Sequence, residues 1–175
     1  MTSANRVFFT IVIASGVSAA PALAEPPPPR LLGTYADWTA YAMPEAKGEI
    51  CYAVSKPKKL EPAKVKRADA HLLVTHRPAE KQNNVVSVEL GYTTAKDTNA
   101  AVLIGKDKYE FFTNQQTAWA RDSETDKNVV TAMARGNEFV AKAKPPTGSE
   151  TIDTYSLAGF SDALAQIDKA CKVKR

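Results

Sequence analysis

The chain has 175 residues, with 23 Lys and Arg against 19 Asp and Glu and a net charge of +4. Nucleic-acid-binding domains usually carry a larger, clustered positive charge, so this balance argues against a nucleic-acid partner. No segment after residue 24 is long and apolar enough for a transmembrane helix, and the length suits one soluble domain.

Residues 1–24 have the pattern of a secretory signal peptide. Arg6 supplies the positive charge, residues 7–17 form an apolar run, and Ala22 and Ala24 form an A-x-A cleavage site. An uncleaved anchor or a buried N-terminal helix is the alternative, but the apolar run is short for a bilayer. Cleavage after Ala24 leaves 175 − 24 = 151 residues. We therefore expect a periplasmic protein. A surface-associated or secreted protein is the alternative.

Residues 25–33 are rich in proline and predict an extended tether. Short alternating runs separated by turns follow, and they predict a single β-rich domain over residues 34–175. The predicted strands cover residues 37–41, 50–54, 71–75, 85–92, 101–104, 109–112, 129–134 and 139–141. The last four form two hairpins, around Gly105 and Gly136. This pattern is typical of an antiparallel β-sandwich or barrel, and the sequence leaves that choice open.

The C-terminal segment changes its period. Apolar side chains recur there at spacings of three and four residues, which places them on one stripe of a helix. They are Leu157, Phe160, Leu164, Ile167 and Cys171. The pattern predicts one C-terminal α-helix over about residues 157–171, and Ser156 is suited to cap its start.

The two cysteines, Cys51 and Cys171, predict a disulfide. An exported chain enters an oxidising space, and two cysteines allow one intramolecular pairing. A catalytic thiol or a metal ligand is the alternative, but the chain has no C-x-x-C pair and no recognisable metal spacing. The bond would fasten the C-terminal helix to the strand that carries Cys51.

Motifs for catalysis and metal binding are weak. His71 and His76 are five residues apart, which puts them on opposite faces of a strand and prevents joint chelation of one metal. There is no G-x-S-x-G motif and no Gly-rich phosphate loop. Glu124 and Asp126 lie in a polar segment, 121–128, that we expect to be a solvated loop. We therefore predict no enzyme, metal or cofactor. A hydrolase is the remaining alternative, and its active site would have to form from residues that are far apart in the sequence.

Residues 56–67 concentrate positive charge, with one acid among them. The basic residues are Lys56, Lys58, Lys59, Lys64, Lys66 and Arg67. Pro57 and Pro62 exclude a helix or a central strand. One interpretation is an exposed loop that contacts an anionic envelope polymer, a membrane surface or a host-cell component. The alternative is a solvated loop that keeps an edge strand from pairing.

Aromatic residues occur along the whole predicted domain. They include Trp38, Tyr41, Tyr52, Tyr92, Tyr109, Phe111, Phe112, Trp119, Phe139 and Phe160. We expect most of them in the core, because a β-rich domain of this size needs large side chains inside. Some of them are candidates for lining a ligand groove.

Three segments resemble the invasion-associated locus B family of alphaproteobacteria: YADWT at 35–39, ICY at 50–52 and YSLAGF at 155–160, which leads to a final cysteine. Many members place a cysteine soon after the tryptophan, where this chain has Tyr41, so the family's disulfide pattern is not carried over whole. The resemblance implies an exported, mostly β envelope protein. The first hypothesis is an interaction protein that supports host-cell contact or invasion. The second is a periplasmic accessory or ligand-binding protein, and the third is a hydrolase.

Overall fold

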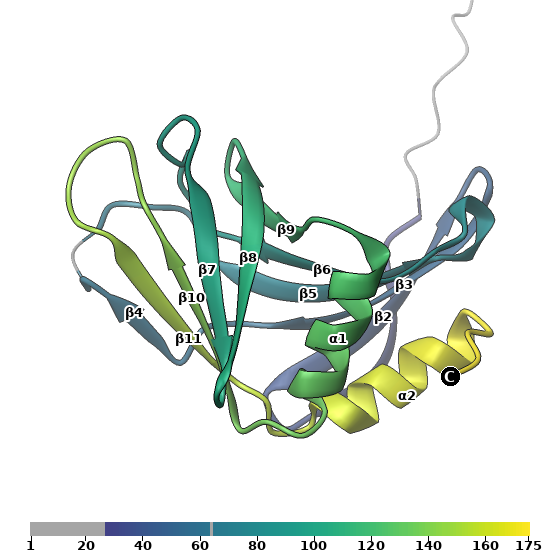
Figure 1. The fold of residues 1–175 in the computed structure, drawn as a ribbon. Coiled ribbons are helices and arrows are strands. Elements are labelled where there is room, and N and C mark those ends of the chain that lie inside the picture. The colour runs from purple at the N-terminus through teal and green to yellow at the C-terminus, as the bar shows by residue number, and fades with distance from the viewer. Residues whose placement is uncertain (1–26, 64) are drawn as a thin grey trace, which may run out of the picture.

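The computed structural model describes residues 27–63 and 65–175, so the predicted signal peptide and Lys64 lie outside the described residues. Eleven strands form one antiparallel sheet in the order β1-β2-β3-β5-β6-β9-β8-β7-β10-β11-β4 (Figure 1). The strands are β1 Arg30–Tyr35, β2 Trp38–Glu45, β3 Gly48–Ser55, β4 Lys59–Glu61, β5 His71–Arg77, β6 Gln82–Glu89, β7 Asn99–Ile104, β8 Asp107–Asn114, β9 Thr117–Ala120, β10 Glu138–Ala143 and β11 Thr151–Ser156. A short 3-10 turn, Pro78–Glu80, and two helices, α1 Ser123–Met133 and α2 Phe160–Ala170, complete the fold.

The prediction of a mainly β protein is confirmed, but the expected sandwich or barrel is wrong. Every strand belongs to one hydrogen-bonded sheet, and the sheet stays open because β1 and β4 stand at its two ends. The sheet curls strongly, so β7, β8 and β10 cross the direction of β2, β3 and β5 at a steep angle (Figure 1). Alternation along a strand tells which residues face inward, and a curled single sheet produces the same alternation as a sandwich.

The curl gives the whole sheet one shared core. Inward side chains of nearly all the longer strands and of both helices belong to a single buried cluster. Trp38 lies at its centre, with its ring 4.8 Å from that of Phe160 and its indole N–H donating to the Ser156 carbonyl at 3.0 Å. Phe139 links the ring of Phe111 to that of Tyr155. Burial of each such ring stabilises the fold by about 1.5–3 kcal/mol. The expected core position is confirmed for Trp38, Phe111, Phe139 and Phe160.

Four strands were not predicted: β1, β4, β9 and β11. β1 begins at Arg30, so it takes up the last residues of the predicted tether, while residues 27–29 are exposed and irregular. β4 has only three residues, and β9 has four. Three of the six residues of β11 are Thr or Asp, yet Thr151, Asp153 and Tyr155 point inward. Short length and polar inward residues hid these strands.

Helix α1 corrects the prediction of a strand over 129–134 and of a polar loop over 121–128. Asp122 caps the helix, since its carboxylate accepts the Thr125 backbone N–H at 2.7 Å. The buried residues follow at helical spacing: Asp126, Val129, Val130 and Met133. Two β-branched valines suggested a strand, and the first member of the apolar stripe is an acid, so the helical period was missed.

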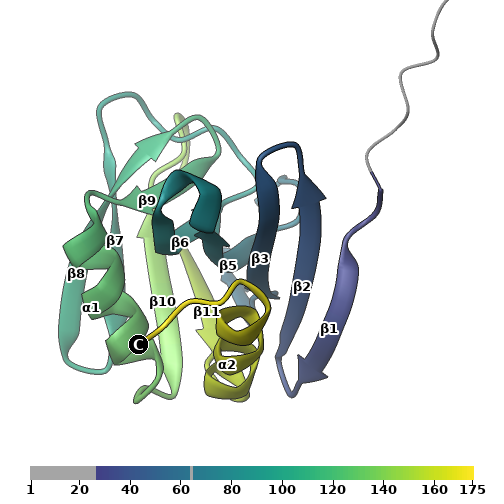
Figure 2. The same ribbon diagram turned by 90° about the vertical axis from the view of Figure 1, so that its right-hand side faces the viewer.

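Helix α2 confirms the predicted C-terminal helix but starts later, at Phe160. Gly159 precedes it with φ +85°, and a Cβ at Gly159 would lie 1.9 Å from the Tyr35 carbonyl oxygen. This close approach to β1 requires glycine. Ser156 does not cap the helix, because its hydroxyl accepts the N–H of Ala158. Both helices lie on the same side of the molecule, and α2 packs across β1, β2 and β3 (Figure 2).

The predicted disulfide is present between Cys51 of β3 and Cys171, directly after α2. Its sequence separation is 120 residues. A closed loop of that length stabilises a fold by about 4–5 kcal/mol in the chain-entropy account. The bond therefore fixes the end of α2 to β3, the third strand from the β1 end of the sheet.

We expect the double variant Cys51→Ala, Cys171→Ala to lower the free energy of unfolding by about 3–5 kcal/mol, because the unfolded chain is then unconstrained. Urea unfolding followed by circular dichroism measures this. Wild-type protein treated with a reductant is the matched control and should unfold at the same urea concentration as the variant. Equal stability of oxidised wild type and variant would refute the role given to the bond.

Candidate ligand-binding surface

The outer face of the sheet, opposite the core, carries a continuous row of cross-strand neighbours over six strands. The row runs through Thr39, Val54, Leu73, Ser87, Trp119 and Phe112. These side chains point outward because their chain neighbours, such as Trp38, Leu72 and Phe111, are buried. Five strand spacings of about 4.8 Å make the row about 24 Å long.

A stacked aromatic pair marks each end of this row. Tyr41 and Tyr52 lie on β2 and β3 with ring centroids 5.3 Å apart. Phe112 and Trp119 lie on β8 and β9 with centroids 5.6 Å apart. The expectation of a core position is wrong for Phe112, which is 38% exposed, and the other three are only half-buried.

A hollow of about 500 Å³ lies at the β2–β3 end of the row, and we call it the basic hollow. Thr39, Tyr41 and His71 contribute from the outer face. Lys56 and Lys58 contribute from the segment after β3. The structure thus brings two of the six predicted basic residues together with one aromatic pair.

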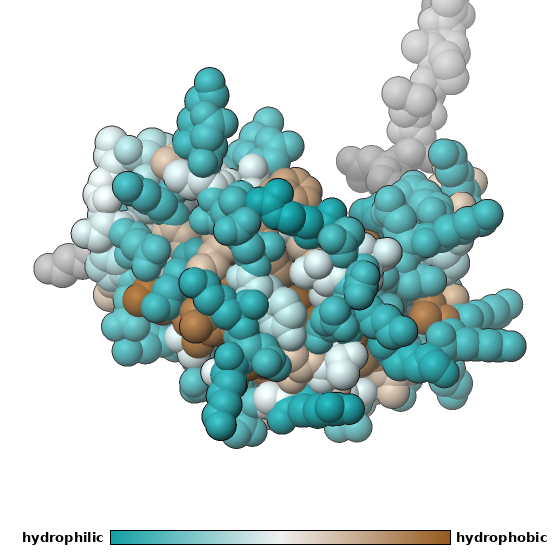
Figure 3. All heavy atoms as spheres, in the orientation of Figure 1, coloured by the Kyte–Doolittle hydropathy of each residue, from teal (hydrophilic) through white to brown (hydrophobic). Residues whose placement is uncertain are grey.

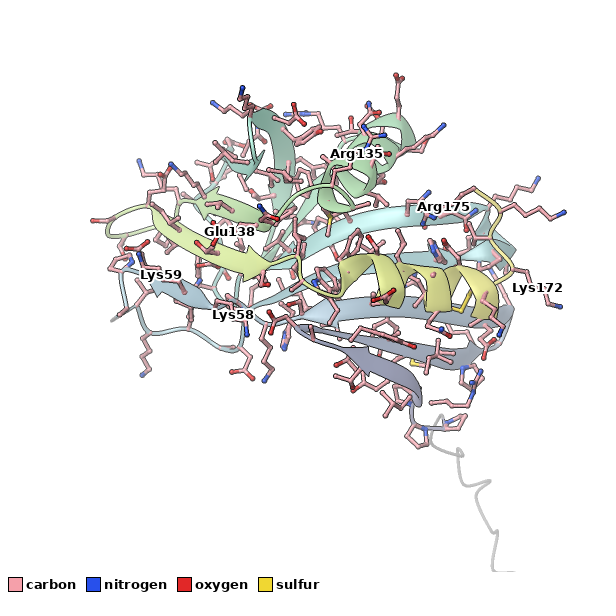
Figure 4. All side chains as sticks on the ribbon, turned by 90° about the horizontal axis from the view of Figure 1, so that it is seen from below. Lys58, Lys59, Arg135, Glu138, Lys172 and Arg175 are labelled. Carbon is pink, nitrogen blue, oxygen red and sulfur yellow. A yellow bond between two sulfur atoms is a disulfide. The ribbon has the colours of Figure 1, made fainter. Side chains whose placement is uncertain are left out.

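The three lysines nearest β4 each have an acidic neighbour. Lys56 pairs with Asp69 at 3.3 Å, Lys58 with Asp37, and Lys59 with Glu61 at 3.0 Å. Figure 4 shows Lys58 and Lys59 near β4, far from Lys172 and Arg175 beyond α2. Exposed ion pairs contribute only about 0–1 kcal/mol, so an anionic partner can replace Asp69 and Glu61 at little cost. Asp37 is half-buried, with 25% of its side chain exposed. Lys66 is also exposed.

Arg67 belongs to the interior and is not a surface contact, contrary to the prediction. Its guanidinium donates two hydrogen bonds, of 2.8 and 2.6 Å, to the carboxylate of Asp153, and the two side chains are 5% and 0% exposed. It also donates to the Leu90 carbonyl and lies over the Tyr92 ring. Burial raises the pKa of Asp153, and Arg67 opposes that rise. The inward acid in a strand was the available signal, but it required knowledge of β11.

A second hollow, of about 510 Å³, lies at the β8–β9 end of the row, and we call it the aromatic hollow. Phe112 and Trp119, with Val85 and Ala120, supply its apolar surface. Its polar lining is Lys81, Gln82, Asn83, Asn114, Arg121, Asp122, Ser123 and Asp126. Sequence reasoning missed this site, although the spacing of the two aromatic residues around a turn is the signal that could have found it.

Asp126 is buried at the base of the aromatic hollow, so the expectation that it is solvated is wrong, whereas Glu124 is exposed as expected. β6 pairs with β9 only from Ser87 onward, and Asp126 Oδ1 accepts the unpaired N–H of Val86 at 2.8 Å. Burial raises the pKa of Asp126 to about 6, partly offset by this hydrogen bond. The carboxyl group therefore closes the exposed edge of β6.

The two histidines lie on opposite faces of β5, as predicted. His71 Nδ1 lies 3.0 Å from Glu89 on the outer face. His76 is fully buried, with Nε2 donating to Asp168 at 2.9 Å and Nδ1 accepting the N–H of Asn84 at 3.0 Å. Burial lowers the pKa of His76, and Asp168 opposes this. No group of three His, Cys, Asp or Glu within residues 27–63 and 65–175 is arranged to hold a metal ion.

The fold and the outer face define a disulfide-linked, mainly β domain with ligand-sized hollows. The family model described as "Invasion associated locus B (IalB) protein" matches residues 38–168, so the chain belongs to the invasion-associated locus B family. The crystal structure of invasion associated protein B from Bartonella henselae is similar, with a TM-score of 0.59 and 17% identity over 80% of this chain and 96% of that chain. At this identity the likeness shows the fold alone. No curated protein matches.

The disulfide is consistent with an exported protein. Neither helix in the described part of the chain is long and apolar enough to cross a membrane.

We expect Asp126→Asn to raise the free energy of unfolding at pH 8 by about 1–3 kcal/mol, because the amide oxygen keeps the Val86 hydrogen bond without a buried charge. The pKa of Asp126 rises from 3.8 to about 6 on folding, so the wild type loses stability as the pH rises through this window. The gain should vanish near pH 4. Urea unfolding at both pH values measures it, and Asp126→Ala, which lacks the acceptor, should be destabilised at both. A gain that does not depend on pH would contradict this account.

We also expect His76 to titrate below its ordinary pKa of 6.5. Protonation at Nδ1 would break the hydrogen bond from Asn84. Between the two pKa values the unfolded chain binds more protons, so this group reduces stability as the pH falls from about 6.5 through the folded-state pKa. NMR titration of the imidazole signals measures this, and His76→Gln assigns the signal because the chain has only two histidines. A midpoint at or above 6.5 would contradict the prediction.

Proposed function

We propose that this protein is a non-enzymatic interaction module of the cell envelope that binds an anionic partner at the basic hollow. The observation that carries the proposal is that the exposed Lys56 and Lys58 lie beside Tyr41 in one hollow on the outer face of the sheet. Lysines attract phosphate and carboxylate groups, and the half-buried ring adds a contact surface.

The state of the two ammonium groups supports this proposal. Both lysines are exposed; Lys56 pairs with the exposed Asp69, and Lys58 pairs with Asp37, which is half-buried in the lining of the hollow. Long-range attraction is weakened by salt beyond about 10 Å, so such a surface works best at direct contact with a densely charged partner. Envelope polymers and anionic headgroups provide that density.

The buried titratable groups support a non-enzymatic role. Asp126 closes the edge of β6, Asp153 pairs with Arg67, and His76 joins α2 to β6. Each of these perturbed groups has a structural task at some distance from the basic hollow. A catalytic acid or base usually faces the space in which a substrate binds, and none of these three groups lines the basic hollow.

Export to the periplasm and contact with a host cell are further parts of the proposal. The similar Bartonella structure is that of a protein described as invasion associated. For this chain, an anionic host-cell surface and an anionic surface of its own envelope offer the same chemistry to Lys56 and Lys58. The second candidate is a periplasmic accessory or ligand-binding protein, and the aromatic hollow favours it.

We expect Lys56→Gln, Lys58→Gln to weaken binding to vesicles of phosphatidylglycerol and phosphatidylethanolamine about 30-fold, since each lysine near an anionic surface contributes about 1 kcal/mol. Co-sedimentation at low and high salt measures this. Lys106→Gln, Lys108→Gln removes the same charge from the exposed β7–β8 turn and is the matched control. Equal weakening in both variants, or none in the first, would refute the basic hollow as the binding site.

A further inference from the structure

The aromatic hollow lies outside the surface that the proposed function uses. It is formed by β8, β9, the start of β6 and the start of α1, at the far end of the row from Lys56 and Lys58. About 24 Å of sheet separates the ends of the row. An inference about this hollow therefore stands or falls independently of the anionic partner.

Phe112 is unusual among the exposed apolar residues. Three large hydrophobic side chains are exposed in the described part of the chain: Leu31, Leu60 and Phe112. Leu31 and Leu60 lie on the end strands β1 and β4, whereas Phe112 lies on β8, inside the sheet. Figure 3 shows that polar residues cover most of one face of the molecule and that hydrophobic surface is limited to small separate patches. An exposed ring in mid-sheet needs a reason beyond packing.

The ring stack gives the hollow an apolar platform. Phe112 and Trp119 lie with their planes 26° apart, as direct cross-strand neighbours. The face of an aromatic ring carries partial negative charge, so it attracts C–H groups that carry partial positive charge. A flat, weakly polar face of a ligand fits such a platform better than an anionic group does.

The base of the hollow offers a buried hydrogen-bonding group. Asp126 is only 7% exposed, and of its two carboxyl oxygens Oδ1 accepts the Val86 N–H. Among the described residues, no hydrogen bond is found for the second oxygen, Oδ2, so it remains available to a ligand. Around the rim, the amides of Gln82, Asn83 and Asn114 can both donate and accept. This set suits a ligand that carries several hydroxyl groups.

The charges of the hollow largely cancel. Arg121 pairs with Glu110 at 2.8 Å, and Asp122 is engaged in capping α1. Lys81 and the acid Asp126 are the remaining ionisable groups of the lining. A strongly charged ligand would find no matching excess here, so the electrostatics favour a neutral ligand.

We propose that the aromatic hollow binds a neutral hexopyranose unit of a glycan. A pyranose ring has a face of C–H groups to lie on Phe112 and Trp119. Its hydroxyl groups can reach Asp126 and the rim amides. The volume of about 510 Å³ lies within the range of about 300–1,000 Å³ that is typical of small-molecule sites.

The test uses the oxidised chain from Glu25 onward and three neutral probes: maltohexaose, cellohexaose and chitohexaose. Saturation-transfer NMR should show contact to the ring C–H protons of at least one probe, and calorimetry gives its affinity. Phe112→Ala and Trp119→Ala should each weaken that binding about tenfold. Leu60→Ala removes a comparably exposed apolar side chain from β4, outside both hollows, and should leave that binding unchanged.

Two further variants separate a binding role from a folding role. Asp126→Asn keeps a hydrogen-bonding amide at the base of the hollow and should retain binding within about threefold, whereas Asp126→Leu should lose it. Circular dichroism melts identify any variant that has unfolded. Phe112→Ala should perturb folding least, because Phe112 is exposed.

Absence of binding to all three oligosaccharides would overturn the proposal. Binding that Phe112→Ala and Trp119→Ala both retain would overturn it as well, as would binding that Leu60→Ala abolishes. None of these outcomes bears on the lysine variants and vesicles, so the two proposals fail separately.

Discussion

The attachment of α2 to the inner side of the sheet is the constraint on which the rest of the structure depends. An open, curled sheet of eleven strands leaves part of its apolar inner face uncovered unless another element packs there. α2 is held at its start by the Phe160 ring against Trp38, and at its end by the Cys51–Cys171 bond. His76 adds a buried hydrogen bond to Asp168 between these two points. Because the helices serve the inner face, the outer face remains free for ligands.

The same constraint explains why the most perturbed charges are structural. A sheet that is not closed has strand edges and bends where backbone groups lack partners, and buried polar side chains complete them. Asp126 supplies an acceptor to β6, and Arg67 supplies a donor to the Leu90 carbonyl while it neutralises Asp153. These buried charged side chains are therefore needed because the sheet is open.

The sequence allowed prediction of those features that depend on one strand, one helix or one pair of residues. The disulfide followed from two cysteines and the export pattern, and α2 followed from a clear apolar stripe. α1 was missed because Asp126 occupies a buried position of its stripe. The single sheet was missed because alternation over residues 85–92 shows which way Ser87 points and not that Leu73 and Trp119 flank it. A surface built from cross-strand register requires the pairing of distant segments, which one sequence does not contain.

The outer face combines two modest sites on one stiff support. Tyr41 of the basic hollow and the rings of the aromatic hollow lie at opposite ends of one run of paired strands, about 24 Å apart along the curved sheet, whereas Lys56 and Lys58 lie on the segment after β3. Two weak contacts at a fixed distance gain strength when one extended ligand spans them, because the second contact forms at a high effective concentration. A glycan with neutral rings and spaced acidic groups meets both requirements.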